Sequence, residues 1–168
     1  NSWGTGWGSG GYFYISYYDT AFGRDSYMAV HNNAEPVVNY SGIYQYDPLG
    51  NVMQCGYGSS TGWFANVFTA QSSSVLSAVG FYTESPGTSY QVYTGSSLAA
   101  KTLNTSGTQE YMGFHTVPLA TPVELTDGQS FIVAVKVTSP GTSYPIAMEY
   151  PYSGYSAGAS ASSGQSYI

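Results

Sequence analysis

Three side chains in this sequence could act as a nucleophile or a base: the single cysteine, Cys55, and the histidines His31 and His115. A thiolate cleaves a peptide only when a histidine base, an oxyanion hole and a group that orients the histidine act together. Cys55 lies in a polar, glycine-rich stretch, residues 54–58, that is typical of a loop, and neither histidine has a catalytic sequence context. We therefore expect no peptide hydrolysis by this chain alone.

The first twelve residues carry the most specific motif, Asn1-Ser2-Trp3-Gly4 followed by Trp7-Gly8 and Gly11-Tyr12. This segment resembles the Asn-Ser-Trp-Gly motif of papain-like cysteine proteases. The resemblance implies that Asn1 corresponds to the residue that orients the catalytic histidine, and that Trp3 corresponds to the tryptophan that covers that hydrogen bond. It also implies that Gly11–Ser16 is the strand that closes the protease sheet. In that family the nucleophile and base precede this asparagine, so the chain is expected to lack both.

The charge balance excludes two classes of partner. The charged fraction is 7% and the net charge is −6, with only Arg24, Lys101 and Lys136 as cations. Three cations cannot follow a phosphate backbone, so we expect no nucleic acid binding. No apolar run of about 18 residues could span a membrane. The sequence has no initiating methionine or signal peptide, which leads us to expect a processed piece of a longer precursor.

The hydrophobic pattern predicts strands almost throughout. From Phe131 to Thr138 apolar residues recur at every second position, and Val75–Thr83 and Tyr90–Thr94 are further β-rich runs. The hexapeptide Ser-Pro-Gly-Thr-Ser-Tyr occurs at residues 85–90 and 139–144, where Pro-Gly fits the centre of a tight turn. We expect two equivalent hairpins in an all-β fold, a two-sheet antiparallel β-sandwich or jelly roll.

Four segments resemble the lectin-like β-sandwich domain that follows papain-like proteases in some prokaryotic, often archaeal, surface proteins. These segments are residues 46–50, 62–70, 114–117 and 123–128. The resemblance implies three parts: a protease remnant at 1–19, a connector at 20–39 and a lectin-like sandwich at 40–168. Two asparagine sequons and the scarcity of charge agree with an extracellular, cell-surface location.

Exposed aromatic rings are the sugar-binding candidates, because a flat ring stacks on the face of a pyranose. Glycine-containing loops point to Tyr57, Tyr152 and Tyr155 as the exposed ligand-binding residues. Trp63 stands in an apolar strand, so we expect it in the core.

Other candidate sites concern modification and metals. The sequons predict glycosylation at Asn39 and Asn104. Cys55 is either an intermolecular disulfide partner or a small buried hydrophobe. The acidic residues are scattered, so we expect no metal site and no cofactor, although a structural calcium ion remains an alternative.

Three functions are compatible with these features. The first, narrowly favoured by the 18 tyrosines, the 21 glycines and the low charge, is a structural subunit that self-assembles with other copies into a surface layer or sheath. The second is a lectin-like module that targets a secreted cysteine protease to surface glycan. The third is an inactive fragment of an otherwise active papain-like peptidase.

Overall fold

The computed structural model describes residues 4–22, 36 and 38–168, and divides into two compact units, Asn1–Gly42 and Ile43–Ile168. Asn1, Trp3 and His31 lie outside the described residues. In the first unit, the expected strand at Gly11–Ser16 is not formed, and residues 13–16 are irregular. Residues 7–12 form a tight turn, in which the Gly11 amide donates to the Trp7 carbonyl at 2.7 Å and Ser9 and Tyr12 form an isolated bridge. A strand needs a neighbouring strand, and the described part of this unit provides none.

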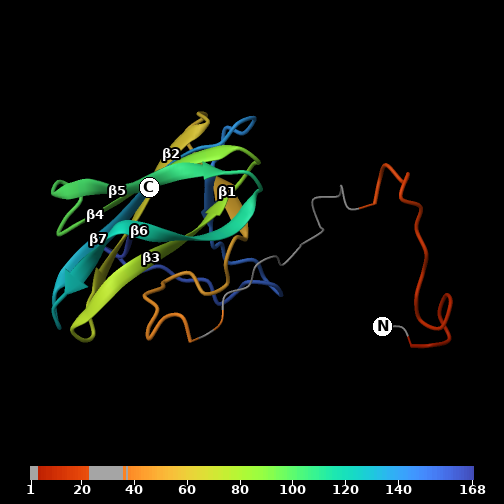
Figure 1. Ribbon diagram of the computed structural model, residues 1–168, viewed down its shortest axis with the longest axis horizontal. Coiled ribbons are helices and arrows are strands. Elements are labelled where there is room, and N and C mark those ends of the chain that lie inside the picture. Colours follow the sequence, from red (N-terminus) through yellow and green to blue (C-terminus); the bar gives the residue numbers. More distant parts are fainter. Residues whose placement is uncertain (1–3, 23–35, 37) are drawn as a thin grey trace. The chain divides into compact units, whose positions relative to one another are not determined.

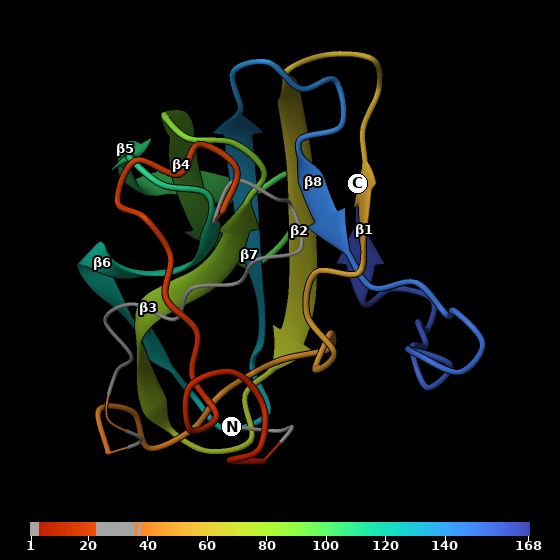
Figure 2. The same ribbon diagram turned by 90° about the vertical axis from the view of Figure 1, so that its right-hand side faces the viewer.

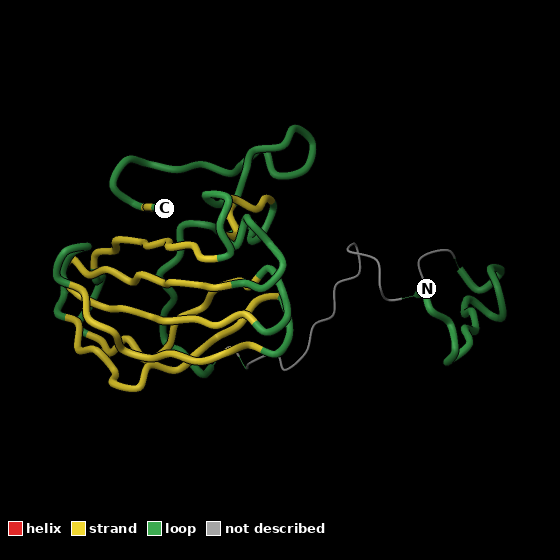
Figure 3. The backbone as a smooth tube through the Cα atoms, turned by 90° about the horizontal axis from the view of Figure 1, so that it is seen from above, coloured by secondary structure: helices red, strands yellow, loops and turns green. Residues whose placement is uncertain are grey.

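The second unit contains nine strands and, among the described residues, no helix (Figure 1). The prediction of an all-β antiparallel fold is therefore confirmed. The strands, which run alongside one another in Figure 3, are β1 (Met53–Cys55), β2 (Thr61–Thr69), β3 (Ser74–Thr83), β4 (Thr88–Gly95), β5 (Lys101–Gln109), β6 (Gly113–Leu125), β7 (Ser130–Thr138), β8 (Ile146–Met148) and β9 (Ser166–Tyr167). We found no helix in the described residues that is long and apolar enough to cross a membrane.

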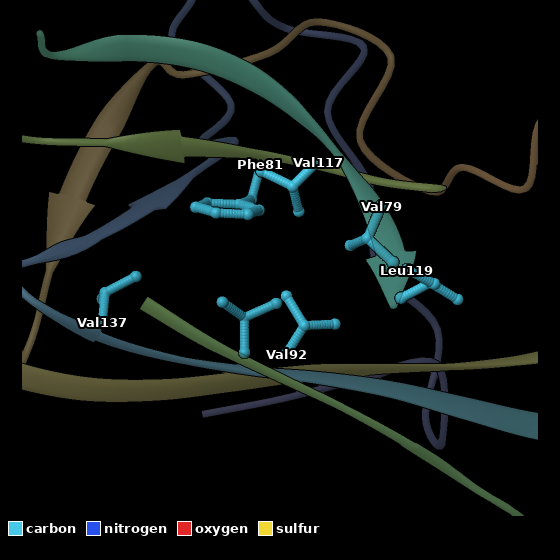
Figure 4. Close-up of a cluster of buried hydrophobic side chains, with 7 residues drawn as sticks. Val79, Phe81, Val92, Val117, Leu119 and Val137 are labelled. Atoms are coloured by element: carbon cyan, nitrogen blue, oxygen red, sulfur yellow. The ribbon is translucent and has the colours of Figure 1, made fainter. Parts of the chain in front are cut away.

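One five-stranded sheet forms the larger layer, in the order β5-β4-β7-β2-β9, and β3 pairs with β6 in the opposing layer. The central strand β7 is apolar on both faces because neighbours cover both of its edges and side chains pack on both of its faces. Its inward residues Val135 and Val137 meet Val79 and Phe81 of β3 across the interior (Figure 4). Burial of this cluster holds the two layers together.

Aromatic side chains close one end of the sandwich. Phe68 and Phe131 are buried there, and the segment before β1 adds Tyr44 and Tyr46. The ring of Tyr46 stacks on Phe68 at 4.7 Å between centroids, and its hydroxyl donates to the Val67 carbonyl at 2.7 Å. The phenol groups are thus hydrogen-bonded where their rings are packed, as the burial of tyrosine requires.

The two Pro-Gly turns are correctly predicted as turns, but the predicted hairpins are wrong. Gly87 and Gly141 have φ of 73° and 78°, the left-handed values that favour glycine. However, the first turn carries the chain from β3 to β4, which lie in different sheets, and the second carries it from β7 to β8, which also lie in different sheets. Both turns are therefore corners between layers. The Pro-Gly composition of these turns specifies a tight bend, but it does not specify which strand pairs with the one that follows.

The short sheet β1-β8 lies beside the sandwich, next to β2 (Figure 2). Cys55 pairs with Ile146 and Met53 with Met148. Ile146 is 1% exposed, so this small sheet extends the apolar interior on the β2 side. Cys55, expected in a loop, is the last residue of β1.

Candidate functional site

The outward side of the five-stranded sheet carries an unusual group of side chains. Because side chains alternate along a strand, the residues between the core positions of β2, β4 and β7 point away from the interior. Trp63 on β2 lies directly opposite Lys136 on β7, which in turn lies opposite Gln91 on β4. We call Trp63, Gln91, Tyr93, Lys101 and Lys136 the Trp63 face.

Trp63 is 39% exposed, and the expectation that it belongs to the core is wrong. Its neighbour Phe64 packs against the core instead. Apolar residues occur on both sides of β2, so the sequence alone does not decide whether Trp63 or Phe64 points inward. The register of β2 with β7 decides it. The ring of Trp63 lies 5.2 Å from that of Tyr93, centroid to centroid. Two small buried residues, Ala65 and Ala134, lie in the same outward layer and leave room for these large rings.

Two ammonium groups approach the Trp63 ring. Lys101 Nζ lies 5.6 Å and Lys136 Nζ lies 5.7 Å from the ring centroid, both within the range of a cation–π contact. The Lys101 ammonium also donates to the Leu98 carbonyl at 2.8 Å. These lysines come from β5 and β7, and they are two of the three basic residues in the sequence.

Polar groups border the two rings. The Tyr93 hydroxyl donates to Gln91 Oε1 at 3.3 Å, which fixes both side chains. In the next outward row, the hydroxyls of Thr61 and Thr138 are 2.9 Å apart. The face thus offers two aromatic rings, an amide, several hydroxyls and two ammonium groups. This combination can contact both the apolar face and the hydroxyl edge of a sugar ring.

The tyrosines predicted as ligand-binding residues are exposed but are not brought together. Tyr57, at 63% exposure, lies in the β1–β2 connection, whereas Tyr152 and Tyr155, at 46% and 81%, lie between β8 and β9. Tyr152 contacts Tyr150, with 4.9 Å between ring centroids. In the described part of the chain, no ring contact joins Tyr57 to Tyr152 or Tyr155. The buried Ser156 hydroxyl donates to the Tyr150 carbonyl at 2.5 Å and holds that loop.

Cys55 lies beside a buried carboxylate. Glu84 is 7% exposed and accepts hydrogen bonds from the side-chain amides of Asn51, at 2.8 Å, and Gln54. Burial raises the pKa of Glu84, and the two amides partly offset this rise. Burial, and then the charge of Glu84, raises the pKa of the Cys55 thiol. A thiol held protonated in this way is a poor nucleophile.

His115 has the structural role that its strand position suggests. Its Nε2 atom lies 3.0 Å from the Tyr111 carbonyl and 3.1 Å from Thr83 Oγ1. Burial lowers the pKa of His115, and the hydrogen bond to Tyr111 opposes that shift. No hydrogen bond joins His115 to Cys55 in the residues that the structure describes.

The two predicted glycosylation sites differ in their surroundings. Asn39 is exposed, and its backbone N–H group donates to the Pro36 carbonyl at 3.0 Å. Asn104 is half-buried on β5, and its side-chain Nδ2 donates to the Thr121 carbonyl of β6 at 2.7 Å. Its Oδ1 accepts from the Thr121 amide at 3.3 Å, so one side chain bridges the two layers. Glycosylation at both positions stays a prediction.

A cavity of about 460 Å³ lies near this bridge, between the ends of β4–β5 and β6–β7. Its lining includes Thr94, Asn104 and Thr121 but no charged side chain. Its aromatic wall, Phe131, is 3% exposed and so presents little ring surface. Among the described residues, no group of three or more histidine, cysteine or acidic side chains could hold a metal ion. The Trp63 face is therefore the stronger ligand site.

Comparison with known proteins gives a family and two similar structures. The family model described as Lectin like domain matches residues 43–168. The first similar structure is the clostridial cysteine protease Cwp84, which carries a cysteine-to-alanine substitution and is seen after propeptide cleavage. Its TM-score is 0.60 and its identity 26%, and the match covers 74% of this chain and 32% of the Cwp84 chain. The cysteine protease and lectin-like domains of Cwp84, described as a surface layer associated protein of Clostridium difficile, have a TM-score of 0.56 and 30% identity, over 65% of this chain and 26% of that one.

The chain thus spans only about a third or less of the length of these two structures. A comparison with curated proteins found no match.

Proposed function

Because the chain belongs to the lectin-like domain family, which accounts for residues 43–168, we propose that it is a carbohydrate-binding module of a cell-surface cysteine protease. In this role the module binds surface glycan and holds the protease near its substrates. The protease partner and the surface location are taken from Cwp84, whose structure contains both kinds of domain and which is described as surface layer associated.

The observation that carries this proposal is the pair of rings on the Trp63 face. The Trp63 and Tyr93 rings lie side by side on the outward side of the sheet, with 41° between their planes, and Trp63 keeps 39% of its area exposed. A rigid strand platform costs little ordering on binding, and Gln91 and Thr61 border it with amide and hydroxyl groups. A sugar stacked on the rings would bury its C–H face there while its hydroxyls meet these polar groups.

Glycan-array binding followed by calorimetry tests the proposal. We expect Trp63→Ala to abolish binding of any glycan that the full chain captures, and Trp63→Phe to retain part of it. Tyr155→Ala serves as the matched control, because it removes an exposed ring, at 81%, from a different loop. Circular dichroism should show that all three variants fold. Glycan binding that survives Trp63→Ala but is lost in Tyr155→Ala would move the site to the β8–β9 loop.

Self-assembly is a second candidate, favoured by a different surface. The turn between β5 and β6 exposes Tyr111 and Met112, at 67% and 58%, and the start of β6 exposes Phe114, at 59%. Adjacent apolar side chains of this kind are typical of contact surfaces. Sedimentation of the chain at increasing concentration, with Met112→Asp as the variant, tests this role. A chain that stays monomeric throughout would exclude it.

A further inference from the structure

Two positive charges meet at the aromatic rings of a strongly acidic chain. The net charge is −6, and of the three basic residues only Arg24 stands elsewhere in the sequence. From this placement we propose that the Trp63 face selects an anionic glycan, one whose sugar units carry carboxylate or phosphate groups. This inference rests on the proposed function and names the ligand class of the same site.

The lysines are not neutralised by the protein. Within the described part of the chain, no carboxylate forms an ion pair with Lys101 or Lys136. The strands that carry this face, β2, β4, β5 and β7, contain no aspartate or glutamate. An anion at this face would therefore meet two positive charges and no carboxylate from the strands beneath it.

The geometry leaves the ammonium groups able to bind a ligand. A lysine ammonium has three donors, and Lys101 uses one on the Leu98 carbonyl. The remaining contact of each lysine is with the Trp63 ring, at 5.6 and 5.7 Å. A cation–π contact at an exposed site is weak, so an anion can draw either group away from the ring at little cost. The freed ring face then meets the sugar, while the ammonium meets its acidic group.

Gln91 and Tyr93 supply the neutral part of this recognition. Gln91 lies beside Lys136 across β4 and β7, and the Tyr93 hydroxyl donates to its Oε1 atom. This bond uses the oxygen of the Gln91 amide, so its Nε2 group can donate to a ligand hydroxyl or carboxylate. Charge and ring stacking are provided by different residues, so they can be removed separately.

Titration calorimetry of the full chain with paired oligosaccharides tests the inference. The probes are tetramers of galacturonate, glucuronate and mannuronate, each compared with its own carboxyl-reduced, neutral form. The phosphate arm is a mannose oligosaccharide that carries 6-phosphate groups, compared with its dephosphorylated form. We expect at least one acidic probe to bind about tenfold or more tightly than its neutral counterpart, with an affinity that falls as NaCl rises. The stronger arm identifies carboxylate or phosphate as the group recognised.

The lysine variants separate the two levels of the proposal. Lys101→Gln/Lys136→Gln should bring the affinity for the acidic probe down to that of the neutral one, about three- to tenfold per lysine, while Lys101→Arg/Lys136→Arg retains the preference. If the unmodified chain binds acidic and neutral probes equally, the anionic preference is wrong and the carbohydrate-binding function stands. If no probe binds and no glycan on the array depends on Trp63, both are wrong.

Discussion

The hydroxyl groups of Thr88 and Ser139 are hydrogen-bonded to each other, with 3.0 Å between their oxygen atoms, and both residues are 0% exposed. Thr88 belongs to the first copy of the repeated hexapeptide and Ser139 begins the second. Ser89 pairs with Thr138 across β4 and β7, so the two corners lie at the same end of the sheet. The repeat therefore forms two adjoining corners joined by a buried polar contact.

Thr88→Val should destabilise the chain by about 1–3 kcal/mol, because valine keeps the shape of threonine but cannot hydrogen-bond. The substitution removes the bond to Ser139 and the one that the Thr88 hydroxyl donates to the Ser85 carbonyl at 2.7 Å. Denaturant unfolding measures the change. Thr142→Val, at the equivalent position of the second copy, is the control, since Thr142 is only half-buried and accepts one local bond from the Tyr144 amide. Equal losses in both variants would contradict the role of the buried contact.

The strands themselves could be predicted well from the sequence, and their partners could not. The β-rich run from Phe131 to Thr138 matches β7 almost residue for residue, because a central strand that is packed on both faces is apolar at nearly every position. A Pro-Gly turn has the same local composition whether the chain returns to the same sheet or crosses to the other. That choice depends on contacts between residues far apart in sequence, which no local pattern contains.

The candidate site was largely invisible in the sequence for the same reason. The small number of cations predicts that the chain binds no nucleic acid, but nothing local indicated that Lys101 and Lys136 would converge on one ring. Trp63 stands among apolar residues, and its direction is set by register with β7. Tyr93 lay in a predicted strand, so only the alternation relative to Val92 could have suggested an outward ring.

Protonation of Glu84 in mild acid should increase the free energy of unfolding of the chain. Its pKa is raised in the folded chain by burial, so the folded state binds the proton more tightly than the unfolded state does. The contribution of Glu84 to the free energy of unfolding therefore increases as the pH falls from the folded-state pKa to the ordinary value of 4.5. The contribution is absent at neutral pH, where Glu84 is ionised in both states. Glu84→Gln, which imitates the protonated form, should flatten this part of the stability profile between pH 7 and 4.5.

Asp47 and His115 also have shifted pKa values, so their contributions must be compared. The pKa of Asp47 is raised by burial and by Glu149, so it acts in the same direction as Glu84. The pKa of His115 is lowered, so its protonation opposes folding in acid. The measurement is thus the difference between the profiles of the parent chain and Glu84→Gln, with Asp47→Asn alongside. Parallel profiles for the parent and Glu84→Gln would refute the prediction.

Cys55 should react slowly with thiol reagents at pH 7. Its raised pKa reduces the thiolate fraction, and its half-buried position in β1 limits access. We expect iodoacetamide to react more slowly with Cys55 than with the thiol of free glutathione. Glu84→Gln should speed the reaction of Cys55, because it removes the nearby negative charge. A rate above that of glutathione would instead favour the predicted intermolecular disulfide, which a non-reducing gel would then show.

Asn104→Ala should cost about 1–3 kcal/mol of unfolding free energy, because it removes the side-chain bridge from β5 to Thr121 of β6. Both the amide and the carbonyl of Thr121 lose their partner, so the loss exceeds that of a single surface contact. Thr108→Ala, at an exposed position of the same strand, should change stability by less than about 0.5 kcal/mol. Asn104→Asp should fall between them at neutral pH, since it keeps the acceptor for the Thr121 amide but places a carboxylate against the Thr121 carbonyl. A loss no greater than that of Thr108→Ala would show that the bridge contributes nothing to holding the two layers together.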